Sequence, residues 1–223
     1  MKKLALIWSI IFFVTSPAGA NEKKFDGFYA GVALSKSYAR DHGKEFESDG
    51  SQYYAQKNQP RGNSFSINSG YNKVFNDFYV AGIDISLEKN DVNDTVLQEN
   101  SGVPDACCAV DSKVKESVYF GGKVGAIISE NTLLYISAGK SIKHIKRSYF
   151  DYTLPETHID QLWQRGWYKG FGVEQYISKN YSILADYKRM NLGERSYEGF
   201  PWWGTQKHNY KENNFRIGVN YHF

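Results

Sequence analysis

Apolar and polar residues alternate along most of this chain with a period of two, the pattern of a strand that has one apolar face. The clearest case is the segment 214–223, in which every second residue from Phe215 to Phe223 is apolar. The residues that alternate with them, from Asn214 to His222, are Asn, Arg, Gly, Asn and His. The same test predicts eight strands, at 27–38, 63–75, 78–89, 113–128, 133–145, 166–177, 181–190 and 214–223.

The connections between these predicted strands alternate in length. Short turns lie at 76–77, 129–132 and 178–180, and long segments separate the other neighbours. Hairpin loops in soluble β-proteins are usually short at both ends. Outer-membrane barrels have short turns at one end, long loops at the other and an even number of strands. The pattern therefore predicts an all-β fold, an eight-stranded antiparallel up-and-down transmembrane β-barrel.

The polar face of the predicted strands indicates which side of the barrel is inside. A soluble ligand-binding barrel turns its apolar face inward, whereas a membrane barrel turns that face to lipid. Here the polar face is rich in Gly, which makes room in a narrow eight-stranded barrel. It also carries charges of both signs, which must pair if they are enclosed. The predicted lumen ionic network comprises Asp84, Glu88, Lys123, Glu174, Asp186, Lys188 and Arg216. We expect Arg216 to pair with Glu174, Asp186 or Asp84.

A few polar residues fall on the predicted lipid face. Glu116, Lys140, His144 and Lys169 lie in the strand halves farther from the short turns, and Gln175 lies near the opposite end. A charge at the bilayer midplane costs about 2–4 kcal/mol, and near the interface about 0–1 kcal/mol. We therefore expect these residues near the membrane edges, where long side chains can reach water.

The first twenty residues have the layout of a secretory signal. Two lysines precede an apolar run from Leu4 to Val14, and small residues follow up to Ala20. The run is too short for a membrane-spanning helix, which needs about 20 apolar residues. We predict a cleaved signal peptide at 1–20 and one outer-membrane β-barrel domain at 21–223. Both ends of the mature barrel are then expected in the periplasm, with the long segments outside the cell.

Charge and composition restrict the partners. Removal of Lys2 and Lys3 lowers the Lys+Arg count from 27 to 25, against 24 Asp+Glu, so the mature chain is nearly neutral. This balance gives no reason to expect a nucleic-acid partner. An aromatic content of 16% favours strands over helices.

The sequence offers little catalytic or metal-binding chemistry. Cys107 and Cys108 are adjacent and can form a vicinal disulfide or pair between molecules. No cluster of His or Cys accompanies them, so we expect no metal site. None of the five histidines lies two residues from a serine on one strand face, as a Ser–His pair on a single strand of the wall would need. We expect no catalytic residue, no cofactor and no enzyme activity, with a lipid A-modifying enzyme as a remote alternative.

Four aromatic residues outside the predicted strands are candidate loop contacts: Trp163, Phe200, Trp202 and Trp203. Exposed aromatic side chains are common at binding hot spots. The alternative is that they pack on neighbouring loops or reach the aromatic girdle at the membrane interface.

The predicted strands resemble those of the small opacity/Omp25-like outer-membrane β-barrel proteins of Gram-negative bacteria. The resemblance lies in GFYAGVALS, LLYISAGKS, the hairpin GWYKGFGVEQYISKNYSILADYKR and the closing NFRIGVNYHF, and it leaves out the long segments. It implies an outer-membrane location, among lipids and lipopolysaccharide, and insertion by the barrel assembly machinery. In this family that machinery reads the terminal aromatic strand, so the resemblance implies an assembly signal at Tyr221 and Phe223.

Members of that family serve as surface antigens, adhesins or structural, porin-like proteins. The resemblance therefore implies a non-enzymatic barrel whose long segments face the environment and can contact a host or surface ligand. The alternative is a narrow porin-like channel for small solutes. Because the long segments match no particular member, no ligand is carried over.

Overall fold

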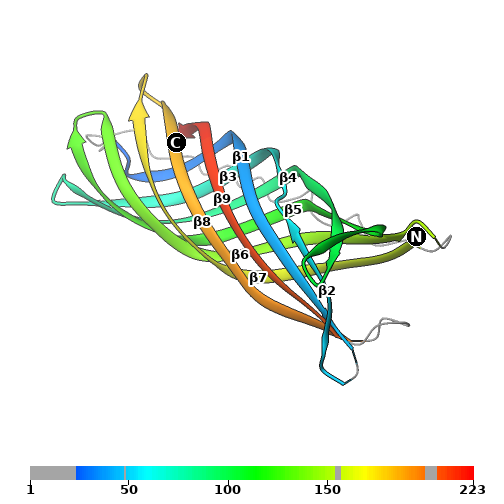
Figure 1. Ribbon diagram of the computed structural model, residues 1–223. Coiled ribbons are helices and arrows are strands. Elements are labelled where there is room, and N and C mark those ends of the chain that lie inside the picture. The colour runs from blue at the N-terminus through cyan, green and yellow to red at the C-terminus, as the bar shows by residue number, and fades with distance from the viewer. Residues whose placement is uncertain (1–23, 48, 154–156, 199–204) are drawn as a thin grey trace, which may run out of the picture.

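The computed structural model describes residues 24–47, 49–153, 157–198 and 205–223. The predicted signal peptide at 1–20 lies outside these residues. The described part is built of strands joined by turns (Figure 1), and it contains no helix long and apolar enough to cross a membrane. The strands are β1 (Gly27–Phe46), β2 (Gln52–Asn58), β3 (Arg61–Phe75), β4 (Tyr79–Asn100), β5 (Val103–Ser129), β6 (Thr132–Asp151), β7 (Thr157–Tyr176), β8 (Tyr181–Glu198) and β9 (Thr205–His222).

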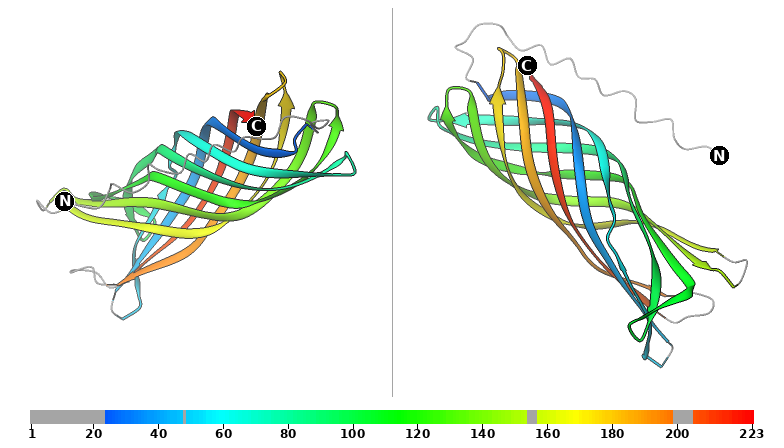
Figure 2. Two further views of the ribbon diagram at one scale, coloured as in Figure 1. Left: turned by 180° about the vertical axis from the view of Figure 1, so that it is seen from behind. Right: turned by 45° about the horizontal axis from the view of Figure 1, so that its top comes forward.

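These strands form one antiparallel sheet that closes on itself (Figure 2). Their order is β2-β1-β3-β4-β5-β6-β7-β8-β9, and β1 also pairs with β9. The closing pair runs without a shift in register from Tyr29 opposite His222 to Phe46 opposite Thr205. Strands β1 and β3 to β9 therefore form a closed wall of eight strands, which confirms the predicted all-β barrel.

The short strand β2 is absent from the sequence-based prediction. It folds back along the far half of β1, from Asp41 opposite Asn58 to Phe46 opposite Gln52. It also pairs with the end of β4. We call this end of the barrel the mouth. The opposite end, which holds the short β3–β4, β5–β6 and β7–β8 connections and the C-terminus, is called the turn end.

The prediction of long loops is wrong for most of the residues concerned. Strand β4 continues to Asn100 and β5 begins at Val103, so only Ser101 and Gly102 join them. Apart from β3, which begins at Arg61, the other wall strands also extend well past their predicted ends at the mouth. The alternation is hidden in these extensions because polar residues occur on both faces. In β4, Asp91 faces outward and its neighbour Asn90 is buried inside.

The two-residue turns have the backbone that a twisted hairpin needs. Asn76 and Asp77 have φ angles of 50° and 57°, and Ser101 and Gly102 have 53° and 84°. Positive φ at both central positions characterises the tight hairpin turn that suits strongly twisted strands, and Asn, Asp and Gly tolerate it best.

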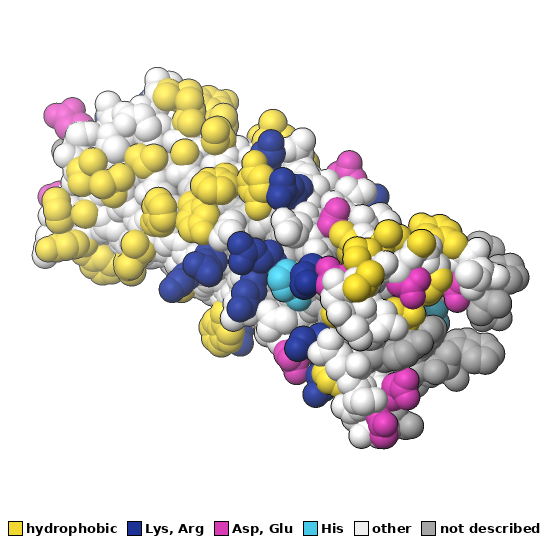
Figure 3. All heavy atoms as spheres, viewed as in Figure 1, with side chains coloured by type: hydrophobic (Ala, Val, Ile, Leu, Met, Phe, Trp, Pro, Cys, Tyr) yellow, Lys and Arg dark blue, Asp and Glu magenta, His cyan; other side chains and the backbone are white. Residues whose placement is uncertain are grey.

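The outer surface carries a wide apolar band next to the turn end (Figure 3). In β9, Phe215, Ile217, Val219 and Tyr221 are exposed while the residues between them are buried, and Ile217 is 66% exposed. Leu34, opposite Ile217 on β1, is 67% exposed. Such exposure of large apolar side chains is costly in water and favourable in lipid. The prediction that the apolar face points outward is therefore confirmed.

Inward-facing glycines allow the barrel to be narrow. A Cβ atom added at Gly121 would lie 2.2 Å from Tyr168 Oη and 2.4 Å from the Ala138 carbonyl oxygen. At the neighbouring Gly122, which alternates to the outer face, the nearest atom to an added Cβ is the Gly82 carbonyl oxygen at 3.4 Å. Overpacking inside a filled interior costs about 1–3 kcal/mol.

We predict that Gly121→Ala lowers the free energy of unfolding by about 1–3 kcal/mol, because backbone on the neighbouring strand blocks the new methyl group. Gly122→Ala, one residue away, is the matched control and should change it by less than about 0.5 kcal/mol. Urea unfolding in lipid vesicles, followed by the heat-modifiable gel shift of the folded barrel, measures both. Equal effects of the two substitutions would contradict the tight lumen.

Candidate functional site

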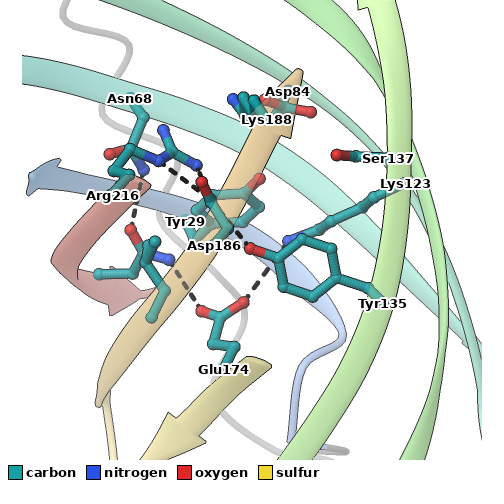
Figure 4. Close-up of a pocket in the computed structure, with 12 residues that line it drawn as sticks. Tyr29, Asn68, Asp84, Lys123, Tyr135, Ser137, Glu174, Asp186, Lys188 and Arg216 are labelled. Carbon is teal, nitrogen blue, oxygen red and sulfur yellow. Dashed lines mark hydrogen bonds and ion pairs between the residues drawn. The ribbon is translucent and has the colours of Figure 1, made fainter. Parts of the chain in front are cut away.

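The lumen next to the turn end is filled by a network around Glu174 of β7 (Figure 4). Lys123 Nζ lies 3.5 Å from Glu174 Oε2. Ser182 Oγ and Asn220 Nδ2 donate hydrogen bonds of 2.6 and 2.8 Å to Glu174 Oε1. Side chains from three other wall strands, β5, β8 and β9, therefore converge on one buried carboxylate of β7.

Arg216 of β9 pairs with Asp186 of β8, one of the three partners that we expected. Its Nε donates to Asp186 Oδ2 at 2.9 Å, and Tyr135 Oη donates to the same oxygen at 3.1 Å. Both charged side chains are more than nine-tenths buried. A buried ion pair of this kind is costly to break, because the remaining charge is left without a partner or water.

The middle of the lumen is closed by tyrosines and a lysine. Tyr119 and Tyr168 pack edge to face, with ring centroids 5.9 Å apart. Lys188 Nζ lies 5.0 and 4.9 Å from the two ring centroids, within cation–π range. Tyr119 Oη also donates to Glu88 Oε2 at 2.8 Å. With Asp84 also buried, all seven residues of the predicted network point into the lumen.

A second layer of charge, farther toward the mouth, was not predicted. Lys143 Nζ lies 3.0 Å from Glu212 Oε2, and both side chains are almost fully buried. Tyr210 Oη and Ser37 Oγ donate to the Glu212 carboxylate at 2.6 and 2.8 Å. Lys143 stood on the polar face of its predicted strand, but Glu212 fell in a predicted loop, so the pair could not be recognised from the sequence.

A third layer lies at the mouth, beyond the apolar band. Arg147 Nε and Nη2 donate to the two carboxylate oxygens of Asp41 at 2.8 and 2.9 Å. Burial raises the pKa of Asp41, but Arg147 and His208 outweigh burial and hold that pKa well below its usual range. Burial and Arg147 lower the pKa of His208, which keeps its imidazole ring neutral at pH 7. The ring lies between Asp41 and the Tyr149 hydroxyl, with Nδ1 3.4 Å from Asp41 Oδ1 and Nε2 2.9 Å from Tyr149 Oη.

Glu45, also at the mouth, is a buried carboxyl without a cation within ion-pair distance among the described residues. Gln98 and Gln206 donate to its Oε1 at 2.5 and 2.8 Å. Burial raises the pKa of Glu45 from 4.5 to about 7, against a smaller lowering by the hydrogen bond from Gln98. Glu45 therefore changes protonation near neutral pH, unlike Asp41.

The filled lumen leaves little space for a substrate or a solute. The cavity between Glu174, Asp186, Lys123 and their neighbours holds about 20 Å³, close to the room that one water molecule needs. Tyr29, Tyr119, Tyr135 and Tyr168 are all buried at or beside this level. At this level the described side chains therefore hold charge and structure in place, and the space that they leave is about the size of one water molecule.

One Ser–His pair was missed because it joins two strands. Ser182 Oγ on β8 lies 2.9 Å from His222 Nε2 on β9. Glu174 Oε1 lies 3.1 Å from the same Nε2 atom, so the carboxylate does not orient the ring through its other nitrogen as in a catalytic triad. Both side chains are buried, and this geometry indicates a structural hydrogen-bond cluster. In the described part of the chain, no three His, Cys, Asp or Glu side chains are grouped as metal ligands.

The other predicted contact residues have varied positions. Trp163 lies in β7 and not in a loop. Its side chain faces outward and is 49% exposed, and its ring stacks on that of His144 with the ring centroids 4.9 Å apart. Phe200, Trp202 and Trp203 lie outside the described residues. Cys107 and Cys108 form a vicinal disulfide in the mouth part of β5. Tyr221 and Phe223 pack together on the outer surface at the turn end, 5.1 Å between ring centroids.

Four of the five polar residues predicted on the lipid face, Glu116, Lys140, His144 and Gln175, have a partner on that face, whereas Lys169 has no ion-pair partner among the described residues. Glu116 binds both Lys89, at 3.0 Å, and His144, at 2.9 Å. Lys140 Nζ lies 3.3 Å from the centroid of the Trp167 ring. At the turn end Gln175 accepts a hydrogen bond from Thr132. These contacts lie at the two edges of the apolar band, as we expected.

The outer membrane protein beta-barrel domain family matches residues 6–223. The chain belongs to this family and is an outer-membrane β-barrel protein of the Gram-negative type. No match is found among curated protein sequences.

Solved structures share this fold. The outer membrane protease OmpT of Escherichia coli is similar with a TM-score of 0.57 and 11% identity, over 90% of this chain and 98% of that chain. The outer membrane protein OprG of Pseudomonas aeruginosa has a TM-score of 0.57 and 11% identity, and the match covers 89% of this chain and 96% of OprG. Ail, the attachment invasion locus protein of Yersinia pestis, has a TM-score of 0.45 and 17% identity. That match covers 89% of this chain and 99% of Ail. Because a protease is among them, the shared fold by itself does not determine the role of this chain.

We predict that Asp186→Asn lowers the free energy of unfolding by about 3–5 kcal/mol, because it leaves the Arg216 guanidinium buried and unpaired. The double variant Asp186→Asn/Arg216→Gln should recover most of this loss. Asp91→Asn, which removes an exposed carboxylate 3.5 Å from Lys113 on the outer surface, is the control; its effect should stay below about 1 kcal/mol. Urea unfolding in vesicles tests the three variants. A double variant as unstable as the single one would contradict the proposed pairing.

We further predict that stability depends on Glu45 between pH 4.5 and 7. Below pH 4.5 the carboxyl is protonated in both the folded and unfolded states. As pH rises to about 7 only the unfolded state ionises freely, so stability falls. The free energy of unfolding of Glu45→Gln, relative to that of the unsubstituted chain, should therefore be about 3 kcal/mol higher at pH 8 than at pH 4.5. This figure takes about 1.4 kcal/mol for each unit by which the pKa is raised.

Unfolding titrations at the two pH values measure this difference. The exposed Glu47→Gln should show no such pH-dependent gain. An equal gain for both substitutions, or none for Glu45→Gln, would show that Glu45 has an ordinary pKa.

Proposed function

We propose that this chain is a non-enzymatic outer-membrane barrel with a closed lumen, which acts at the cell surface as an antigen or adhesin or stabilises the envelope. In this proposal the turn end and both termini of the mature chain face the periplasm. The mouth, with the extensions of β1 to β9, projects outside the cell. The barrel assembly machinery inserts the chain, with Tyr221 and Phe223 as the assembly signal.

The observation that carries this proposal is the closure of the lumen by three layers of paired charge. The pairs Arg216–Asp186, Lys143–Glu212 and Arg147–Asp41 follow one another from the turn end to the mouth. A solute path would have to break buried ion pairs whose single members are costly to leave alone. This argues against the narrow porin-like channel as the alternative role.

The same packing argues against an enzyme inside the barrel. Among the described residues, the Ser–His contact of Ser182 with His222 is buried in the lumen near the turn end. A lipid substrate from the mouth would have to pass the three charge layers, and one from the turn end would meet the buried rings of Phe25 and Tyr176, which pack against His222.

The mouth supports a surface role because it is long and built of strands. Neighbouring extensions pair with each other, for example from Asn93 opposite Lys113 to Leu97 opposite Ala109, except those of β7 and β8, whose pairing ends at Trp167 opposite Asn191. Their interior is held by the Arg147–Asp41 pair and by the hydrogen bonds to Glu45. Recognition surfaces commonly consist of variable segments mounted on such a scaffold.

We predict that the purified full chain shows no steady single-channel conductance in a planar bilayer, because no continuous water path follows the barrel axis. An open porin recorded in the same bilayer is the positive control. Steady, reproducible conductance steps would contradict the closed lumen and favour the channel.

An adhesin and an envelope-structural protein are separated by binding of labelled protein in nanodiscs to host cells. In the test variant a two-residue turn replaces residues 94–112, which shortens the β4–β5 extension at a point where Asn93 faces Lys113. A substitution at the short β3–β4 turn is the control. Saturable binding that only the shortened variant loses supports an adhesin, and absence of binding supports the envelope-structural role.

A further inference from the structure

A group of basic side chains lies on the outer surface where the apolar band ends toward the mouth. Figure 3 shows Lys and Arg side chains gathered at this boundary. The group on β1 and β6 to β9 comprises Lys36, Arg40, Lys140, Lys169, Arg189 and Lys211, all of them exposed. We call it the basic cluster.

The register of the sheet brings like charges of the basic cluster directly together. Lys169 of β7 is opposite Arg189 of β8, and Lys211 of β9 is opposite Arg40 of β1. Residues directly opposite on one face of an antiparallel pair are the closest cross-strand neighbours, and like charges there destabilise the sheet. Two such pairs on the same part of the wall are unfavourable unless an anion lies between them.

The protein itself supplies no such anion among its described residues. No carboxylate of the described chain forms an ion pair with any member of the basic cluster. On β2 to β5, by contrast, Lys57, Lys73, Lys89 and Lys113 each lie within ion-pair distance of a carboxylate. Lys89 binds Glu116 at 3.0 Å, and Lys113 lies 3.5 Å from Asp91.

The surface directly below the basic cluster is apolar and hollowed. Leu134, Val173, Ala185, Ile217 and Leu34 follow one another around the wall in register. The small Ala185 lies between larger neighbours, with Phe171, Tyr187 and Phe215 in the next row toward the mouth. These residues and Lys36 line a single open groove on the lipid-facing surface. The groove therefore ends at the basic cluster.

We propose that this surface is a binding site for a phosphorylated glycolipid of the outer leaflet, of the lipid A type. Its phosphate groups would lie between Lys169 and Arg189 and between Lys211 and Arg40, and its acyl chains would occupy the groove over Ala185. Lys and Arg are the side chains suited to phosphate. We expect a glycolipid with two phosphates because the basic cluster contains two like-charged pairs above one groove.

This inference rests on the proposed orientation of the barrel, with the mouth outside. It does not depend on the surface role, because a chain without conductance and without host binding can still bind lipid A. An experiment can therefore contradict the surface role without contradicting lipid A binding, and the reverse.

The test uses the full mature chain refolded in nanodiscs of neutral phosphatidylcholine. Lipid A with two phosphates, lipid A stripped of phosphate, and phosphatidylglycerol are added in turn, and bound lipid is counted by native mass spectrometry. The thermal midpoint of the heat-modifiable band is measured in the same samples. We expect tight binding and a raised midpoint with intact lipid A, and binding at least tenfold weaker for the other two lipids.

The variant Lys169→Gln/Arg189→Gln should bind intact lipid A at least tenfold more weakly. Without lipid A its thermal midpoint should be higher than that of the unsubstituted chain, because one like-charge pair has been removed. Lys89→Gln/Lys113→Gln, which removes the same charge from residues already paired with carboxylates, is the matched control and should bind normally.

Several results would overturn the proposal. Equal binding of intact and phosphate-free lipid A would show that the basic cluster holds no phosphate. Equal binding of phosphatidylglycerol would reduce the site to a general anionic surface. Equal weakening by the two double variants would show that net charge, and not the basic cluster, determines binding. If Lys169→Gln/Arg189→Gln does not fold, Lys36→Gln/Arg40→Gln, on the other side of the groove, is tested against the same expectations.

Discussion

The pairing of β1 with β9 is the interaction on which the rest of this structure depends. In lipid every backbone N–H and C=O must be bonded within the protein, so a sheet can cross a membrane only if its two edges meet. Here they meet over eighteen residue pairs, from Tyr29–His222 to Phe46–Thr205. Closure with eight strands sets the circumference, and an eight-stranded barrel leaves just enough interior for its own side chains.

The chemistry of the lumen follows from this narrow circumference. Glycines such as Gly121 and Gly139 are needed where the ring of Tyr168, on the neighbouring strand β7, lies over the backbone of β5 and β6. Charges can enter only as pairs with hydrogen-bond partners, since desolvation costs several kcal/mol per ion. The result is a set of layers, from Glu174 at the turn end to Asp41 at the mouth, that fills the lumen with paired charges. In our proposal the function therefore belongs to the two remaining surfaces, the mouth and the outer wall.

Prediction from the sequence succeeded where the two faces of a strand meet different surroundings. Lipid outside and polar groups inside make successive residues differ sharply, so the strands and their outward apolar face could be predicted, and the seven charges predicted for the lumen are buried side chains. Beyond the band the contrast disappears: Asp91 faces water and Asn90 faces other polar groups, and the extensions were taken for loops. Contacts between strands could not be predicted, because they depend on the register of neighbouring strands, which a single sequence does not give. The Ser182–His222 contact, the Lys143–Glu212 pair and the facing cations Lys169 and Arg189 are examples.

Amide hydrogen exchange of the full chain in lipid bilayers tests the closed barrel most directly. If β1 and β9 are paired as described, the amides of the segment from Phe215 to Tyr221 exchange as slowly as those of Ile83 to Leu87 in β4, which has partners on both sides. Rapid exchange confined to β9 and to the β9-facing amides of β1 would mean that the sheet has free edges. That result would contradict the closed wall and, with it, the filled lumen.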